Sequence, residues 1–432
     1  MRFSLRAALR WFYPGMRVKR WLLLSSVSMG LVVVGLLIAF GKDTIVSLYR
    51  ALPLERHSWA FVALVVGLLG FGVGGFVFSV VRLVRSIAQS LVPRSADRPS
   101  TMIYRRRILE RGPRVVAIGG GTGLSTLLRG LKEETSNITA VVTVMDDGGS
   151  SGRLRAEANV LPPGDVRNCI LALAEDESRL SSYLQHRFDR PAALAGHSLG
   201  NLLLSGLEQA TGGFDRAVEA MASMLNIRGR VLPSTLANTH LVATMEDGAR
   251  VEGESRIVSD PRSIRIVRLT DAPIRAHEDA LDAIAEADLI VLGPGSLFTS
   301  LIPNLLVEGI AGSVEQAAAE KVVVANLMTQ PGETEGYTLR RHLDVLAEYV
   351  NLGSFDLLIA NSETPSEAFL SRYRDEAAEP VVDDLGESNA YGLVVVRERL
   401  LGTAEWGGKE TVKHNPKKLV RAIVKNTRAF GA

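Results

Sequence analysis

Residues 115–134 read VVAIGGGTGLSTLLRGLKEE, and this stretch decides the fold. Val115–Gly119 is a short apolar run typical of a buried strand, and the leucines of Leu124–Glu134 recur at helical spacing. Glycine lets a backbone approach a phosphate closely, and a helix N-terminus offers free N–H groups and a favourable dipole. The stretch therefore predicts a strand, a helix, and between them a phosphate-binding turn formed by Gly120, Gly121, Thr122 and Gly123.

Two well-known nucleotide signatures do not fit this turn. Leu124 stands where the dinucleotide fingerprint has its third glycine, and no Gly-Lys-Ser or Gly-Lys-Thr follows as in a P-loop. A tight turn without a ligand is the structural alternative.

Short apolar runs and helical stretches continue to alternate beyond this unit. The expected strands are Val115–Gly119, Thr139–Met145, Leu289–Leu292, Val322–Asn326, Phe355–Asn361 and Leu393–Val396. The expected helices are Leu124–Glu134, Asn168–Ala174, Leu199–Gln209, Phe214–Leu225, His277–Ala287, Leu297–Glu308, Gly336–Tyr349 and Pro416–Thr427. This order predicts a Rossmann-like α/β fold: a mostly parallel sheet with helices on both faces. His240–Glu246 and Arg250–Ile257, joined through Asp247-Gly248, predict a β-hairpin insert.

A polar loop, DDGGSSGRLR at residues 146–155, follows the second expected strand. Asp146 and Asp147 stand where nucleotide folds place an acid for ribose hydroxyls, or they could hold Mg²⁺ through oxygen ligands. Ser150 and Ser151 could form an anion-binding nest, with Arg153 and Arg155 as phosphate partners. A flexible polar loop is the alternative.

Two further motifs lie downstream. In PPGDVRN, residues 162–168, Asp165 is placed to cap a helix, and Arg167 and Asn168 are the ligand candidates. GHSLG at residues 196–200 matches the nucleophile elbow of hydrolases, but the residues before it form a poor strand. We therefore expect Ser198 and Asn201 to bind a ligand at a helix start rather than to form a catalytic site.

A second glycine-rich turn follows the strand at Leu289–Leu292 and opens a helix. Gly293, Gly295 and Ser296 form this turn, and two such turns in one sheet suit a diphosphate or two phosphorylated ligands. After the next expected strand, Asn326, Thr329 and Gln330 offer neutral hydrogen-bonding groups for a base or a sugar.

The first hundred residues are of a different class. Residues 21–41 and 58–81 carry no charge, and about 20 apolar residues are enough to cross a bilayer. Residues 1–81 are therefore expected to form a membrane anchor of two transmembrane helices, 82–112 a basic linker, and 113–432 the α/β domain. A cleaved signal peptide and buried core helices are the alternatives.

The basic residues predict the orientation of this anchor. Residues 1–20 hold six Lys or Arg and no acid, and the segment after the second apolar run is also basic. Because positive flanks stay inside, we expect a multi-pass protein of the cytoplasmic membrane with both termini and the main domain in the cytoplasm. The net charge of the 432-residue chain is only +2, which argues against nucleic acid as a partner. Its single cysteine, Cys169, excludes an intrachain disulfide.

The motif set resembles one family over about residues 113–425. GGGTG, MDDGGSSGRLR, PPGDVRN, GHSLGNLLL, GPGSLFTSLIPNLLV and ANLMTQPGETEGY occur in the order found in the YvcK-type gluconeogenesis factors. Those proteins are homologous to the CofD-type 2-phospho-L-lactate transferases. The resemblance implies a UDP-sugar ligand such as UDP-N-acetylglucosamine, and a role in cell shape and in growth on gluconeogenic carbon sources. A cell-wall or metabolic enzyme as partner, and a homo-oligomer, are compatible with such a regulator.

The resemblance also assigns residues. It places the first phosphate loop at 120–123, an acidic pair at 146–147, a Gly-Asn pair ending at Asn201, and the second loop at 293–296. Members often carry Arg-His before the last helix, where this chain has Lys413-His414, and Lys cannot make the bidentate contact of Arg. The rival function is a nucleotide-dependent transferase of the CofD type: a regulator leaves its ligand unchanged, and a transferase consumes it.

Overall fold

The structure is a computed structural model that describes residues 19–40, 59–91 and 108–431, apart from 272, 376, 387, 388, 407 and 408. The chain divides into two compact units, Met1–Arg106 and Arg107–Ala432, and each is described by itself. The predicted loop between the apolar helices and most of the predicted linker lie outside the described residues.

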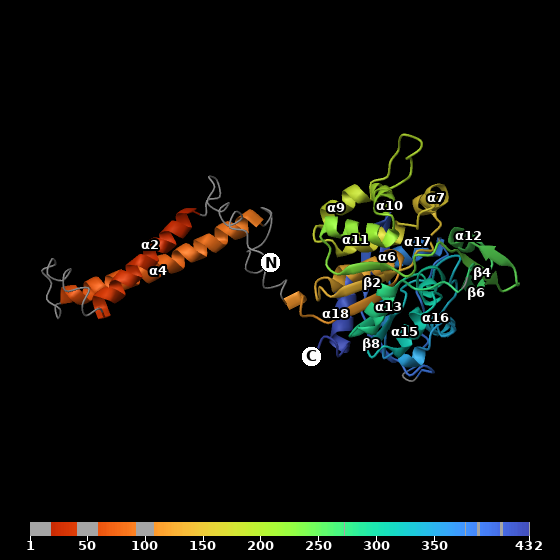
Figure 1. The fold of residues 1–432 in the computed structure, drawn as a ribbon. Helices are drawn as coiled ribbons and strands as arrows, with labels where there is room; N and C mark the ends of the chain where they lie inside the picture. Colours follow the sequence, from red (N-terminus) through yellow and green to blue (C-terminus); the bar gives the residue numbers. More distant parts are fainter. Residues whose placement is uncertain are drawn as a thin grey trace. The chain divides into compact units, whose positions relative to one another are not determined.

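The N-terminal unit contains two paired helices, α2 (Lys19–Phe40) and α4 (Trp59–Leu91) (Figure 1). Trp21 packs edge-to-face on Phe78 with ring centroids 5.9 Å apart, and the guanidinium of Arg82 lies 5.2 Å from the Phe78 ring. A Cβ at Gly72 would lie only 3.0 Å from the Ser28 carbonyl oxygen, so this glycine permits the close approach of the helices.

The membrane anchor is only partly matched by these helices. Among the described residues, Val62–Leu83 is the one segment that is long and apolar enough to cross a membrane, and the apolar part of α2, Leu23–Leu37, is shorter. The second predicted span also has a different end, because α4 continues through Arg82 into the predicted linker as far as Leu91. One candidate span is therefore found in this part of the chain, where the sequence predicted two.

The C-terminal unit is built on a seven-stranded sheet with the order β10-β9-β8-β7-β1-β2-β3, in which every neighbouring pair is parallel. Its strands are β1 (Val115–Gly119), β2 (Ile138–Val142), β3 (Arg230–Pro233), β7 (Leu289–Leu292), β8 (Glu320–Val324), β9 (Leu357–Asn361) and β10 (Val394–Glu398). The predicted Rossmann-like, mostly parallel fold is confirmed. The edge strand β3 was not predicted.

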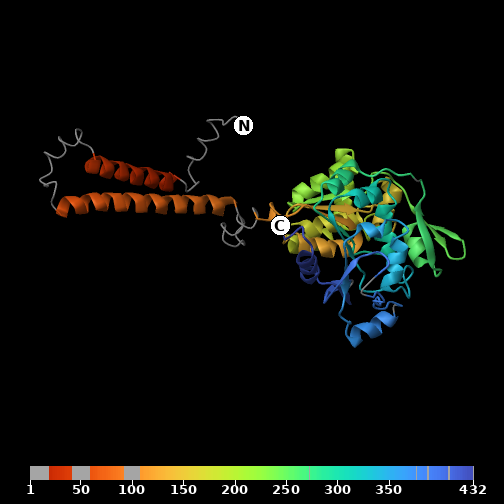
Figure 2. The same cartoon turned by 90° about the horizontal axis from the view of Figure 1, so that it is seen from below.

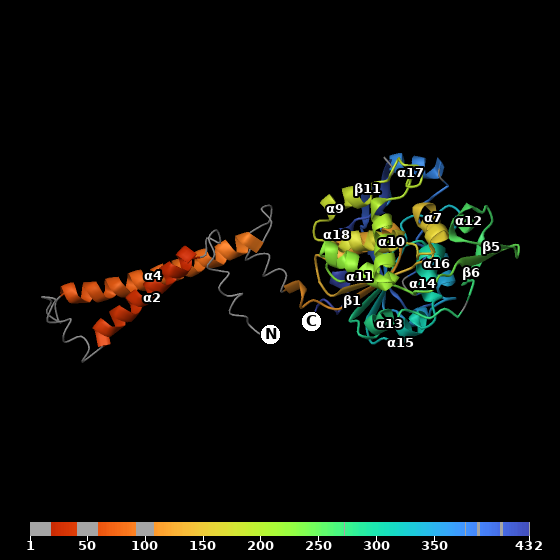
Figure 3. The same cartoon turned by 45° about the horizontal axis from the view of Figure 1, so that its top comes forward.

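Helices cover both faces of the sheet (Figures 1 and 3). Strand residues alternate between the faces, so Val115 and Ala117 pack against one set of helices, and Val116 and Ile118 pack against the other. The first set is α6 (Gly121–Leu131), α8 (Gly164–Leu173), α10 (Leu199–Thr211), α11 (Phe214–Leu225) and α18 (Pro416–Asn426). The second set is α13 (Glu278–Ala285), α14 (Ile302–Leu305), α15 (Ile310–Gln316) and α16 (Leu339–Leu346).

The remaining helices are short. They are α7 (Gly149–Ala158), α9 (Glu177–Leu184), α12 (Glu254–Ser259), α17 (Glu367–Asp375), and the single turns η2 (Leu297–Leu301) and η3 (Leu352–Ser354). The segment after the second strand, for which a flexible loop was one reading, is therefore helical in its second half.

The predicted hairpin insert is present, but it has three strands: β4 (Leu241–Met245), β5 (Arg250–Glu252) and β6 (Ile264–Leu269), visible at the edge of the unit in Figure 2. Its second strand ends at Glu252, five residues before the predicted end at Ile257, because Gly253 turns with a φ of 96° and α12 begins. A separate hairpin of β11 (Leu401–Trp406) and β12 (Lys409–His414), not predicted, precedes α18.

Candidate functional site

The strand order reverses direction next to β1. From β1 the chain proceeds outward through β2 and β3, and it then returns to β7 on the other side of β1. In open α/β sheets, ligands bind at the carboxyl ends of the strands at such a switch point. The two glycine-rich turns follow β1 and β7, so both lie at this point.

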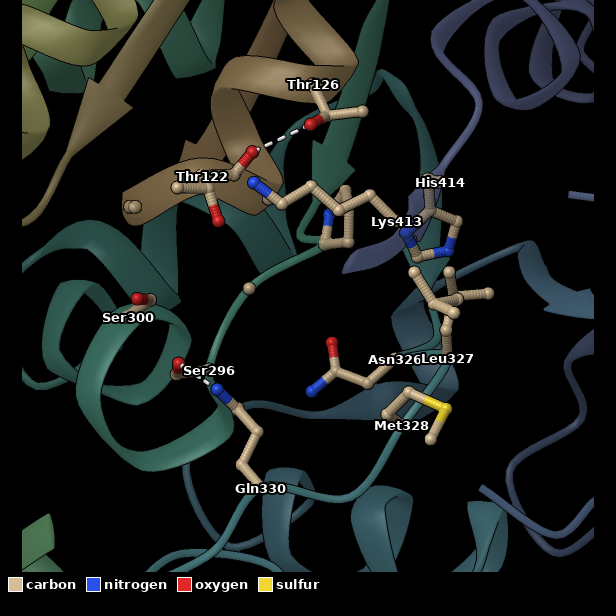
Figure 4. Close-up of a pocket in the computed structure, with 16 residues that line it drawn as sticks. Thr122, Thr126, Ser296, Ser300, Asn326, Leu327, Met328, Gln330, Lys413 and His414 are labelled. Carbon is tan, nitrogen blue, oxygen red and sulfur yellow. Dashed lines mark hydrogen bonds between the residues drawn. The ribbon is translucent and has the colours of Figure 1, made fainter. Parts of the chain in front are cut away.

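A pocket of about 190 Å³ lies there, between the two turns (Figure 4). Four segments build it: the start of α6, the turn after β7, the segment after β8, and the end of β12. The lining residues are Gly120, Gly121, Thr122, Gly123, Thr126, Pro294, Gly295, Ser296, Ser300, Asn326, Leu327, Met328, Gln330, Val412, Lys413 and His414. Ten of the candidate residues, among them Gly295, line this pocket.

Glycine at position 123 is required by the contact between the two turns. A Cβ there would lie 2.8 Å from the carbonyl carbon of Pro294 and would overlap its oxygen. Gly121 instead has a φ of +62°, a conformation that favours glycine, and begins α6. The amides of Thr122 and Gly123 start a helix and so have no partner within it, which makes them available to an anion in the pocket.

The amide of Gly121 already has a partner, because it donates a 2.7 Å hydrogen bond to Oδ2 of Asp165. Asp165 was expected to cap its own helix, but α8 has no side-chain cap, and the carboxyl group reaches across to the first turn. Burial, reinforced by the charge of Asp146, raises the pKa of Asp165 to about 7, although the Gly121 bond and Arg167 oppose the shift.

The second turn is arranged in the same way. The buried carboxyl of Glu333 accepts hydrogen bonds from the Phe298 amide (3.2 Å) and from the Thr299 hydroxyl (3.1 Å) at the start of η2. Burial raises the pKa of Glu333 to about 7 against these bonds. A carboxyl group of the chain itself therefore occupies the start of η2. The residues of this turn that line the pocket are Pro294, Gly295 and Ser296.

The opposite wall offers neutral acceptors. His414 is 8% exposed; burial lowers its pKa to about 4, against a hydrogen bond to the Ala325 backbone. The ring is therefore neutral at pH 7, and its Nε2 is buried without a partner. Gln330 donates through Nε2 to Ser296 (2.8 Å), and its Oε1 is likewise buried without a partner. Both side chains line the pocket, so this wall offers polar groups to a ligand, although Nε2 of His414 and Oε1 of Gln330 are themselves buried.

Lys413 supplies a positive charge to the same wall. Burial, followed by the charge of Arg129, lowers its pKa from the usual value of 10.5.

The other candidates lie outside this pocket and bind one another. Arg167 donates to Asn201 (2.6 Å), to Asn168 (2.8 Å) and to Ser198, and Asn201 donates to Ser150 (3.0 Å). Burial, followed by the charge of Arg187, lowers the pKa of Arg167 to about 10. These side chains form a buried polar cluster, which is connected to the pocket through Asp165.

Three further candidates make local contacts. Ser151 hydrogen-bonds Asp146, and Arg153 donates to the Ala195 carbonyl oxygen (2.8 Å). Thr329, predicted as a ligand group, exchanges hydrogen bonds with the backbone of Glu379 and does not line the pocket, because its side chain fixes that neighbouring segment.

The two carboxylates of the acidic pair each accept a hydrogen bond from a backbone amide. Asp146 accepts from the Gly148 amide and Asp147 from the Ser255 amide, each at 2.8 Å. Within the described ranges, no group of three or more His, Cys, Asp or Glu residues has an arrangement that could hold a metal ion. Burial raises the pKa of Asp146, and Asp147 fixes the start of α12.

Sequence reasoning missed several residues of the site. Thr126 and Ser300 follow Thr122 and Ser296 by four positions, a spacing that places each pair on one helix face and could have revealed them. Asp165 and Glu333 had no such signal, because each acts on a turn far away in the sequence.

The α/β unit is similar to known proteins. Residues 115–401 match the family described as 2-phospho-L-lactate transferase CofD. A gluconeogenesis factor of Bacillus subtilis is 45% identical over 72% of this chain and 97% of its own length. A crystal structure of a Bacillus halodurans protein, also 45% identical, superposes with a TM-score of 0.69 and covers 73% of this chain and all of that chain.

A relative from Nostoc extends the match to the N-terminal unit. It is 42% identical and covers 96% of this chain and 92% of its own length. The segment before the α/β unit is thus shared with some relatives, whereas the Bacillus subtilis protein matches a shorter part of the chain.

Proposed function

The chain belongs to the CofD family, and from this premise we propose that its pocket binds a nucleotide sugar of the UDP-N-acetylglucosamine type. The protein then acts as a gluconeogenesis factor, a ligand-dependent regulator of cell-wall homeostasis and of growth on gluconeogenic carbon sources. The names of its relatives support this role, since the similar Bacillus subtilis protein is a gluconeogenesis factor.

The proposal rests on one observation: the same pocket contains groups that suit a phosphate and groups that suit the N–H and O–H donors of a ligand. The free amides at Thr122 and Gly123 and the charge of Lys413 suit phosphate groups. The polar side chains of Asn326, Gln330 and His414 on the other wall suit the N–H and O–H groups of a base, an acetamido group or a sugar. A diphosphate joined to a base and an amino sugar offers both kinds of group.

A transferase is the second candidate, and the polar cluster behind the first turn favours it. Arg167 and Asp165 lie next to the nucleotide pocket, where a second phosphorylated substrate would need charge and hydrogen-bond donors. The two functions differ in one observable: a regulator returns its ligand intact, and a transferase does not.

The apolar helices support a second part of the proposal. They anchor the α/β unit to the cytoplasmic face of the membrane, where enzymes that use cell-wall precursors are possible partners of a sugar-nucleotide sensor. A homo-oligomer is compatible with the same role.

Ligand binding is tested on the full chain purified in detergent. Mass spectrometry of co-purifying small molecules should identify the nucleotide sugar. UDP-N-acetylglucosamine at a hundredfold excess over its dissociation constant should stabilise the native state by about 2.7 kcal/mol. Stabilisation by GDP but by no UDP-sugar would refute the assignment, and loss of the added sugar nucleotide over time would favour the transferase.

Two buried histidines make a matched pair for this test. His414 and His342 each have a lowered pKa and a buried Nε2 without a partner, but only His414 lines the pocket. His414→Phe should reduce the affinity for UDP-N-acetylglucosamine about tenfold because an apolar ring replaces a polar residue of the pocket wall. His342→Phe should leave it unchanged; equal effects of both changes would place the ligand elsewhere.

A further inference from the structure

The carboxyl group of Asp165 lies directly behind the first glycine-rich turn. Its Oδ2 accepts the Gly121 amide at 2.7 Å, and a Cβ built on Gly120 would come within 2.7 Å of the same oxygen. Gly120 and Gly121 line the pocket on their other side. One layer of backbone therefore separates this carboxyl from the place where a ligand phosphate would bind.

The charged groups around Asp165 come from several elements. Asp146 after β2 and Glu254 on α12 are acids whose charges act on this region, and Arg167, two residues further along α8, opposes them. Cys169 on the same helix is buried, and the charge of Asp165 helps to raise the pKa of its thiol. Acidic groups thus outnumber basic groups around Asp165, and burial is the largest cause of its raised pKa.

A phosphate at the amides of Thr122 and Gly123 would bring a second anion to the turn that already holds this carboxylate. Like charges in one poorly solvated site disfavour double ionisation, so one of the two groups must be neutral. The phosphates of a sugar diphosphate are diesters and stay ionised near neutral pH. Asp165 is the group that can change.

We propose that Asp165 takes up one proton when an anionic ligand binds to the first glycine-rich turn, and so acts as a positioning residue that couples ligand affinity to pH. The proton passes from the buffer to the carboxylate, and no bond of the ligand changes. A protonated carboxyl still accepts the Gly121 hydrogen bond, so the turn keeps its conformation. The inference rests on the proposed anionic ligand.

The test is calorimetric titration of the full chain with UDP-N-acetylglucosamine in buffers of different ionisation enthalpy. With a free-state pKa of about 7, uptake should be near one half of a proton at pH 7 and approach one at pH 8. The affinity should then fall about fivefold between pH 7 and pH 8. Binding without proton uptake would overturn the inference, whereas the absence of binding would refute the proposed function instead.

Two isosteric variants locate the proton. Asp165→Asn keeps an acceptor for Gly121 but cannot ionise, so it should bind without uptake and with an affinity independent of pH. Glu333→Gln changes the equivalent buried acid behind the second turn and should keep the uptake of the wild type. Uptake that persists in Asp165→Asn, or that disappears only in Glu333→Gln, contradicts the assignment.

Infrared difference spectra of the wild type decide the matter if Asp165→Asn does not fold. Ligand addition at pH 8 should produce the carbonyl band of a protonated carboxylic acid, and its absence would overturn the proposal.

Discussion

The backbone amide of Gly121 donates a 2.7 Å hydrogen bond to the carboxyl group of Asp165. This contact joins the start of α6, the element that forms the anion-binding turn, to the second residue of α8. A helix N-terminus stabilises a negative charge, and here that stabilisation acts first on a carboxyl of the protein. Glu333 has the same relation to η2. A phosphate bound as proposed above would therefore use the remaining amides of the first turn, together with Lys413.

Replacing Asp165 by Asn should make the protein more stable at neutral pH. The folded state holds the Asp165 proton up to a pKa of about 7, against 3.8 ordinarily. Its contribution to stability is therefore complete below pH 3.8, is lost as the pH rises towards 7, and is constant above that. Relative to wild type, Asp165→Asn should gain roughly 2–4 kcal/mol between pH 4 and pH 7.5, measured by urea unfolding at each pH.

The Glu333→Gln variant should likewise gain stability relative to wild type as the pH rises, because burial raises the pKa of Glu333 from 4.5 to about 7. A gain that is constant with pH would mean that neither carboxyl is protonated preferentially in the folded state.

Alanine at position 123 should destabilise the fold. The new Cβ would overlap the Pro294 carbonyl group, so the two turns would have to separate. We expect a loss of roughly 1–3 kcal/mol together with weaker ligand binding, measured by thermal unfolding. The control is Gly206→Ala within α10, where a Cβ meets no atom within 4 Å. This variant should be more stable than the wild type by up to about 1 kcal/mol, because alanine has the higher helix propensity. Equal effects at both positions would show that the close contact of the turns is unimportant.

Ser198 should not react as a nucleophile. Its oxygen accepts from Arg167 and from the Asn201 amide as the cap of α10, and the neighbouring His197 is bonded through Nδ1 to Ser150 at 3.0 Å. No base is thus directed at the serine by these contacts. Ser198→Ala should cost about 1 kcal/mol through loss of the cap, and an activated fluorophosphonate should not label the wild type. If the wild type is labelled and Ser198→Ala is not, Ser198 is a nucleophile and the protein is a hydrolase.

The central part of this site follows from sequence patterns, but its supporting side chains do not. Strands β1 and β7 begin and end as predicted, because each is a continuous apolar run bounded by glycine. Strand β3 was missed because Arg230–Pro233 is short, half exposed and ends in proline. Helix α7 begins Gly-Ser-Ser-Gly, residues of low helix propensity, so packing rather than local preference sets its conformation.

The partner of Asp165 could not be predicted from the sequence either. A local rule assigned it to its own helix, whereas its partner Gly121 lies 44 positions earlier in the chain. Only the tertiary fold brings such a pair together.

If both apolar helices cross the membrane, both chain ends should be cytoplasmic. The segments flanking the apolar helices are rich in Lys and Arg, and positive flanks stay inside. A reporter active only in the cytoplasm should therefore work when fused after Ala432. Activity of a periplasmic reporter at that position would contradict the topology and would also remove the pocket from cytoplasmic sugar nucleotides.

Lys413 should account for much of the charge-dependent affinity of the pocket. It lies on β12, on the wall that also carries His414, and burial lowers its pKa from the usual value of 10.5. Lys413→Ala should weaken the binding of UDP-N-acetylglucosamine about tenfold, the effect expected for one charge-assisted hydrogen bond. It should also flatten the dependence of affinity on salt, because a partly buried ion pair is lost.

Arginine at the same position separates charge from geometry. Lys413→Arg keeps the charge and adds a bidentate donor that lysine lacks. If Lys413 binds a phosphate, this variant should bind at least as tightly as the wild type and should keep the salt dependence, as measured by calorimetric titration. If Lys413→Ala and Lys413→Arg both bind like the wild type, the phosphates do not lie against β12. The ligand would then be held by the two glycine-rich turns alone, and the tenfold effect of His414→Phe should be absent as well.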